Sequence, residues 1–66
     1  MKLKDLVRSL EIFYTHFNDK EVDPFAIDYD RSFTIDEPDI PLSEDRIKEL
    51  KELGWKRELF GWWTIL

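Results

Sequence analysis

Carboxylates are the side chains of this sequence that could most readily do chemistry, and they gather in the middle of the chain. Between residues 19 and 45, ten acidic residues stand against two basic ones, and the whole chain has a formal net charge of −5. Five of these acids lie around a predicted turn and the loop that follows it: Asp28, Asp30, Asp36, Glu37 and Asp39. Such oxygen ligands could hold Mg²⁺ or Ca²⁺. Their spacing matches no calcium-binding loop, so a solvated acidic surface is the simpler interpretation.

Other catalytic chemistry has little support in the residue types. His16 is the single histidine, and the sequence places no carboxylate beside it that would orient it as a general base. There is no cysteine, which excludes a disulfide framework and a thiolate metal site. We therefore expect a protein that is not an enzyme and that uses no metal and no cofactor.

The charge of the chain predicts the kind of partner that it would bind. An acidic chain is a poor ligand for nucleic-acid phosphates, so we expect no direct nucleic-acid binding. Carboxylates on a small rigid domain can instead compete with phosphates for a groove lined by Lys and Arg, and long-range attraction speeds the encounter. The first hypothesis is therefore a small acidic protein-interaction module that occupies a basic, nucleic-acid-binding surface of a host protein.

A tryptophan pair near the end of the chain supplies a possible apolar anchor for such a partner. Neighbouring side chains on a strand face opposite ways, so Trp62 and Trp63 cannot both enter one core. The outward one, together with Phe60 at a hairpin tip, would form an exposed patch of the kind found at interface hot spots. Alternatively, the outward tryptophan lies across lysine stems of its own sheet. The candidate partner-binding set takes Phe60 and Trp62 with the five acids, although the sequence leaves open which tryptophan is outward.

The last third of the chain predicts a helix and a hairpin. Ser43 suits the N-cap position, and Gly54 follows an apolar stripe and suits the end of a helix, which predicts a helix over residues 44–53. Two short runs, 55–58 and 62–66, flank Leu59-Phe60-Gly61 and predict antiparallel strands with glycine at positive φ.

The first part of the chain predicts a second set of the same elements. Apolar residues recur at helical spacing from Leu3 to Phe17, whereas Ile12 lies off this stripe and would either widen the buried face or be exposed. Two further runs, 25–29 and 33–35, predict a hairpin. The fold class is therefore α+β, one domain over residues 1–66 in the order αββαββ, with two helices on one face of an antiparallel sheet.

Hydropathy and the N-terminal residues predict where in the cell the protein is found. No apolar run approaches the roughly 20 residues that cross a membrane, and the N-terminus lacks the features of a signal peptide, so we expect a cytoplasmic protein with no membrane partner.

Two alternative functions stay open. One is a small domain that binds a ligand or a divalent metal through the same acids, and the other is a homodimer through residues 62–66, which could form an uncharged sheet edge.

The two ends of the chain resemble a recurring kind of protein. The opening MKLKDLVRSLEIF, followed by NDKEV, and the ending LSEDRIKELKELGW with GWWTIL are similar to small uncharacterised phage and prophage-type bacterial proteins. These have a short N-terminal helix and a C-terminal Leu-Gly-Trp hairpin. The resemblance implies a fold and a mobile-element origin, and it carries over no catalytic residue. It suggests a phage or mobile-element inhibitor whose partner is a host protein such as a defence nuclease complex. The central segment, 25–41, lies outside it.

Overall fold

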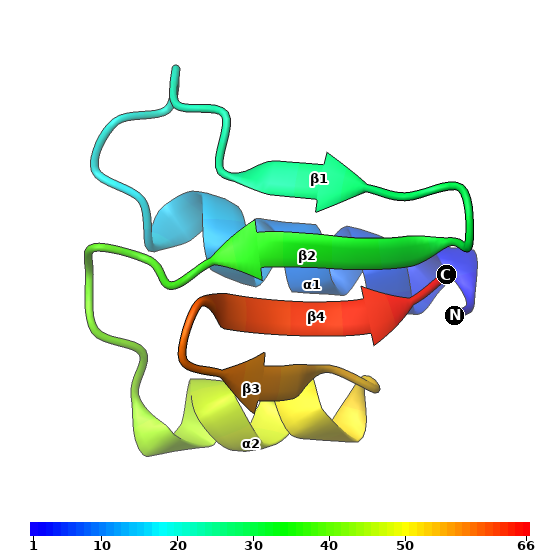
Figure 1. Cartoon of the computed structure of the whole chain (residues 1–66). Coiled ribbons are helices and arrows are strands. Elements are labelled where there is room, and N and C mark those ends of the chain that lie inside the picture. The colour runs from blue at the N-terminus through cyan, green and yellow to red at the C-terminus, as the bar shows by residue number, and fades with distance from the viewer.

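The computed structural model describes all 66 residues, and its helices and strands follow the predicted order (Figure 1). The elements are α1 (Leu3–Thr15), β1 (Phe25–Ile27), β2 (Ser32–Asp36), α2 (Glu44–Glu52), β3 (Lys56–Glu58) and β4 (Gly61–Ile65). The four strands form one antiparallel sheet in the order β1-β2-β4-β3, and residues of both helices share the core on one of its faces. The predicted α+β fold is therefore confirmed.

The two halves of the chain repeat one arrangement. In each half a helix is followed by an edge strand and then by a central strand, and the halves join where β2 pairs with β4. This ladder runs from Ser32 opposite Ile65 to Asp36 opposite Gly61. Because β4 is hydrogen-bonded on both sides, the expectation that residues 62–66 form a sheet edge is wrong. Gly61, Trp62 and Trp63 therefore present no free edge to a second copy.

The turn and cap residues act as predicted. The Ser43 hydroxyl accepts a hydrogen bond of 3.2 Å from the Arg46 N–H and caps α2, and Gly54 after this helix has a φ of 108°. Gly61 begins β4 with a φ of 141°, and a Cβ there would lie 2.3 Å from the carbonyl oxygen of Ile35. Glycine is therefore required at residue 61 both by the backbone conformation and by the close approach of β2.

The core between the sheet and the helices is mostly aromatic. Its buried hydrophobic residues are Ile12, Phe13, Phe17, Phe33, Ile35, Leu50, Trp55 and Trp62. The Phe13 ring packs edge-on against Trp55, with 5.0 Å between the ring centroids. The Trp55 indole N–H donates a 2.8 Å hydrogen bond to the buried hydroxyl of Ser9, so this polar group is satisfied inside the core. Large aromatic side chains suit a chain of this length, since a domain of about this size buries only about 60% of its unfolded surface.

The apolar stripe of α1 is wider than the face that the helix buries. Ile12 is buried and widens the buried face, whereas Val7, Leu10 and Tyr14 remain exposed on the neighbouring side. The exposed side flanks β1, a three-residue edge strand whose side chains are also all exposed. Part of the amphipathic face of α1 is therefore left without a partner.

Candidate functional site

The structure separates the five candidate acids into two groups at opposite ends of β2. Asp28 and Asp30 lie in the turn between β1 and β2, whereas Asp36, Glu37 and Asp39 lie where β2 leads to α2. At about 3.3 Å per residue, the length of this strand holds the two groups roughly 13 Å apart. No group of three or more His, Cys, Asp or Glu side chains is arranged so that it could hold a metal ion. The five acids therefore do not form one site.

The acids of the β1–β2 turn shape the turn itself. One carboxylate oxygen of Asp30 accepts hydrogen bonds from the Ser32 N–H at 3.0 Å and the Ser32 hydroxyl at 2.8 Å. The bond from the Ser32 backbone N–H, and to a smaller extent the bond from its hydroxyl, hold the pKa of Asp30 below its ordinary value. The Ser32 hydroxyl also lies 3.3 Å from a carboxylate oxygen of Asp28. Arg31, in the same turn, has a positive φ of 70°. Asp28 and Asp30 thus have a local structural role.

Glu37 is also engaged within the molecule. One of its carboxylate oxygens accepts hydrogen bonds from the Arg57 guanidinium at 2.6 and 2.7 Å, and the other accepts a 3.1 Å bond from the Trp62 indole N–H. The guanidinium carbon of Arg57 lies 5.2 Å from the centroid of the Trp62 ring. Glu37 therefore ties the start of the β2–α2 connection to the β3–β4 hairpin.

The two tryptophans of β4 face opposite ways, as predicted, but the candidate set contains the wrong one. Trp62 is 0% exposed and packs into the core, so it cannot contact a partner. Trp63 is the outward tryptophan and is half-buried. The Lys56 ammonium on the paired strand β3 lies 5.1 Å from the centroid of its ring. Trp63 is therefore covered in part by a lysine of its own sheet, which was the alternative interpretation.

Three connections meet at one end of the molecule and bring together carboxylates that have no counter-ion (Figure 1). The Asn18 N–H donates a 2.7 Å hydrogen bond to Asp39, which joins the α1–β1 loop to the β2–α2 loop. Asp36 and Glu58 both pair with Gly61, on either side of β4. We name the carboxylates of this region and of the start of α2 the acidic end: Asp19, Glu21, Asp23, Asp36, Asp39, Glu44, Asp45 and Glu58. All of them are exposed, and none is in an ion pair.

Two cations near the acidic end, Lys20 and Arg57, make contacts within the chain. The Lys20 ammonium donates to the carbonyl oxygens of Tyr14 and Phe17 and lies 4.8 Å from the centroid of the Tyr14 ring. Arg57 is paired with Glu37. The tip of the β3–β4 hairpin adds two exposed apolar side chains, Leu59 and Phe60, and Phe60 is 54% exposed. The predicted exposure of Phe60 at a hairpin tip is thus confirmed, and the tip lies beside the acids of this end.

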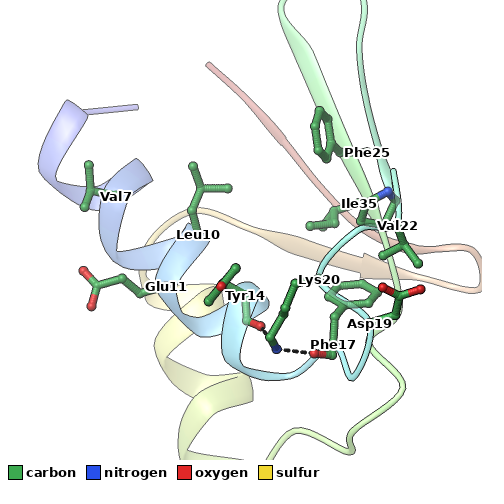
Figure 2. A pocket seen from close by; sticks show the side chains of 11 residues that line it. Val7, Leu10, Glu11, Tyr14, Phe17, Asp19, Lys20, Val22, Phe25 and Ile35 are labelled. Atoms are coloured by element: carbon green, nitrogen blue, oxygen red, sulfur yellow. Dashed lines mark hydrogen bonds between the residues drawn. The ribbon is translucent and has the colours of Figure 1, made fainter.

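An apolar groove between α1 and β1 is a feature that the sequence analysis did not identify. It has a volume of about 470 Å³. In Figure 2, Val7 and Leu10 project from α1 on one side and Phe25 projects from β1 on the other, and the α1–β1 loop closes one end. The available signal was the number of apolar residues on α1. A stripe from Leu3 to Phe17 together with Ile12 is wider than one sheet face can cover.

His16 lies among backbone and hydroxyl groups at the end of α1. It ends α1, and its Nδ1 lies 2.6 Å from the carbonyl oxygen of Ile12 and 3.2 Å from the hydroxyl of Thr15. Its partners are therefore a backbone oxygen and a hydroxyl rather than an orienting carboxylate.

Comparison with known proteins adds no relative. No protein-family model matches the chain, and no curated protein or solved structure matches it either. Neither helix has the length and apolar character that crossing a bilayer requires. The surfaces that could serve a function are thus the acidic end with its apolar tip and the groove beside α1.

Proposed function

We propose that this protein is a small acidic protein-interaction module that binds a basic surface of another protein through the acidic end. The partner is a protein with a groove lined by Lys and Arg, such as the nucleic-acid-binding surface of a host defence nuclease complex. The observation that carries the proposal is the set of exposed carboxylates without counter-ions at the end of the molecule where the hairpin tip also lies. Two cations near these carboxylates, Lys20 and Arg57, are held by groups of the chain itself.

The negative charge of such a surface would speed its association with a basic partner and make it selective for such partners. Charges of one sign that are not neutralised within the protein attract a basic partner over distances of about 10 Å at 0.1 M salt. The same charges repel nucleic acid, so the module would compete with nucleic acid for the partner without binding nucleic acid itself. The protein would act as a mimic of the phosphate backbone in charge alone.

The hairpin tip supplies the apolar contact that charge does not provide. Leu59 and Phe60 are exposed and lie between Glu58 and Gly61, the residue that pairs with Asp36. A large aromatic side chain among polar groups is typical of an interface anchor. Truncation of such an anchor usually weakens binding by roughly tenfold or more. We expect Phe60→Ala to have an effect of this size on partner binding, with little effect on the fold, because the side chain is exposed.

The experiment that tests the proposal compares two variants of equal net charge. The test variant neutralises acids of the acidic end whose side chains make no hydrogen bond: Glu21→Gln, Asp36→Asn and Glu58→Gln. The control variant neutralises acids elsewhere: Asp5→Asn, Asp28→Asn and Glu52→Gln. Each variant changes the formal net charge from −5 to about −2. A difference between the two variants therefore reports the position of the charges and not their sum.

The wild type and both variants would be immobilised and exposed to host-cell extract at low and at moderate salt, and the retained proteins identified. We expect the wild type and the control variant to retain one protein with a basic surface, and the test variant to lose it. Retention should weaken as salt is raised. The proposal is wrong if the test variant retains the same protein as the control, or if no salt-sensitive partner is found.

A further inference from the structure

The outer edge of β1 presents backbone groups that the chain does not use. β1 pairs with β2 on one side only, with Ala26 opposite Thr34. The Asp36 N–H donates to the Pro24 carbonyl oxygen, and the Asp28 N–H donates to that of Ser32, so residues 24, 26 and 28 direct their backbone groups toward β2. By the alternation of an antiparallel ladder, the N–H and C=O groups of Phe25 and Ile27 point to the free edge.

The side chains of these two residues lie on the face of the sheet that carries the apolar groove, and Phe25 lines the groove. Phe25 and Ile27 lie opposite Ile35 and Phe33, which are core residues, so all four side chains are on the helix side of the sheet. Phe25 is 51% and Ile27 57% exposed, because α1 does not cover the edge strand. Figure 2 shows Phe25 facing the side of α1 that carries Leu10. A strand added to this edge would therefore place every second side chain over the groove.

The acidic side chains around the groove favour basic residues at both ends of such a strand. Glu11 and Asp19 line the groove, Asp23 precedes β1 and Asp28 follows it. The only ion pair among these acids is a long one of 3.9 Å between Glu11 and Arg8. Lys20 also lines the groove, but its ammonium is held by two carbonyl oxygens of the chain. An occupant with basic residues on both sides of an apolar centre would meet unpaired carboxylates at both ends of β1.

A second copy of the chain fits the edge less well than a basic partner. In a symmetrical antiparallel pairing centred on Ala26, Phe25 of one copy would lie opposite Ile27 of the other. The same register would bring Asp23 and Asp28 of both copies, four acids without counter-ions, together along the paired edges. Two chains that each carry a net charge of −5 also repel each other.

We propose that the β1 edge and the apolar groove together bind an extended segment of a partner protein, which adds to the sheet as a fifth strand. The segment has apolar residues at alternating positions, which enter the groove, and Lys or Arg on both flanks. This proposal goes beyond the function assigned to the acidic end, because the strand edge and the groove that carry it lie outside that region and share only Asp19 and Asp23 with it.

The probe for this site is a fluorescein-labelled peptide, Lys-Lys-Val-Thr-Val-Thr-Val-Lys-Lys. A second peptide of the same composition with its centre reordered to Val-Val-Thr-Thr-Val removes the alternation, and a third with Glu in place of Lys reverses the charge. Binding to the full chain would be measured by fluorescence anisotropy, and the site would be mapped by ¹H–¹⁵N NMR. We expect the first peptide to bind best and to shift the amide signals of Phe25 and Ile27.

Two variants of the protein test the contributions of the backbone edge and of the groove separately. Ile27→Pro removes an N–H that serves no other group of the chain, and Leu10→Ser removes an apolar side chain from the groove. Each should weaken binding of the first peptide by roughly fivefold to tenfold. Leu59→Ser, at the exposed hairpin tip, is the matched control and should leave binding unchanged. NMR spectra of each variant would establish that it is folded.

Each alternative outcome identifies what is wrong. The proposal is overturned if no peptide binds, if the reordered or acidic peptide binds equally well, or if the NMR shifts map to another surface. If sedimentation shows a dimer that Ile27→Pro dissociates, the edge is occupied by a second copy and not by a basic segment. The acidic-end variant with Glu21→Gln, Asp36→Asn and Glu58→Gln leaves β1 and the groove intact, so failure of the peptide experiment is separable from failure of the proposed function.

Discussion

Replacement of Glu37 by alanine should destabilise the protein, although the side chain lies on the surface and the residue belongs to an acidic segment. Its carboxylate is the acceptor for the Trp62 indole N–H at 3.1 Å and the partner of the Arg57 guanidinium at 2.6 Å. Glu37→Ala removes both interactions at once. The Trp62 ring is buried, and no other acceptor for its N–H is in place.

The expected loss can be worked out from these two contacts. A buried donor left without its acceptor costs about 1–3 kcal/mol, and an exposed ion pair such as that between Glu37 and Arg57 contributes about 0.2–1 kcal/mol. Trp62 is buried but Glu37 is exposed, so water can reach the indole N–H once the carboxylate is removed, and a total of about 2 kcal/mol is expected. For a domain of this size each 1 kcal/mol lowers Tm by about 4–8 °C, so Tm should fall by roughly 8–16 °C.

Thermal unfolding followed by far-ultraviolet circular dichroism measures this loss, with Asp36→Ala as the matched control. Asp36 is the neighbouring acid, it is exposed, and its side chain makes no hydrogen bond, so its replacement should change the free energy of unfolding by less than about 0.5 kcal/mol. Glu37→Gln keeps an acceptor for the indole and should lose only the ion-pair contribution. If Glu37→Ala is as stable as Asp36→Ala, the bridging role of Glu37 is refuted and its carboxylate is free for a partner.

Three further changes test the reasoning behind the fold. Gly61→Ala should destabilise by about 1–3 kcal/mol in urea unfolding or prevent folding, because a Cβ would lie 2.3 Å from the carbonyl oxygen of Ile35 at a positive φ; equal stability would contradict the close approach of the two strands. Ser43→Ala should cost about 1 kcal/mol in the same assay through loss of the α2 cap, and a Ser43→Asp variant that restores stability would identify the cap as the cause. The hydrogen bond from Arg8 lowers the pKa of Glu49, so this group stabilises the fold above its ordinary pKa and ceases to do so as pH falls through its lower folded pKa. The stability gap between the wild type and Glu49→Gln should therefore narrow on acidification from pH 6, and a gap that is constant with pH would show that the ion pair does not contribute.

Local sequence signals were sufficient for the elements of this fold. Ser43, Gly54 and Gly61 each mark a boundary through a requirement of the backbone itself, either a cap or a positive φ, and such requirements do not depend on the rest of the chain. The alternation of side chains along a strand likewise separated Trp62 from Trp63. The alternation could not show which of the two enters the core, because that depends on which face of β4 meets the helices.

The candidate site was harder to predict because it depends on the order of the strands. The sequence places Asp28 and Asp36 close together along the chain, yet β2 holds them at opposite ends of the sheet. The acidic end instead unites loops that are distant in sequence, and this requires β4 to pair between β2 and β3. The bridging role of Glu37 could not be seen for the same reason, since its partners Arg57 and Trp62 reach it only through that pairing.

The repetition of helix, edge strand and central strand in both halves also bears on how the chain folds. Each hairpin, β1–β2 and β3–β4, joins strands that are adjacent in sequence, and such hairpins form within about 1–10 μs. The β2–β4 ladder joins the halves across the whole of α2 and β3, so it requires the closure of a much longer loop. We expect the rate-limiting step of folding to be the docking of two preformed halves along this central ladder. Substitutions at the ladder residues Thr34 and Thr64 should then slow folding, whereas changes at the hairpin tips should mainly alter the rate of unfolding.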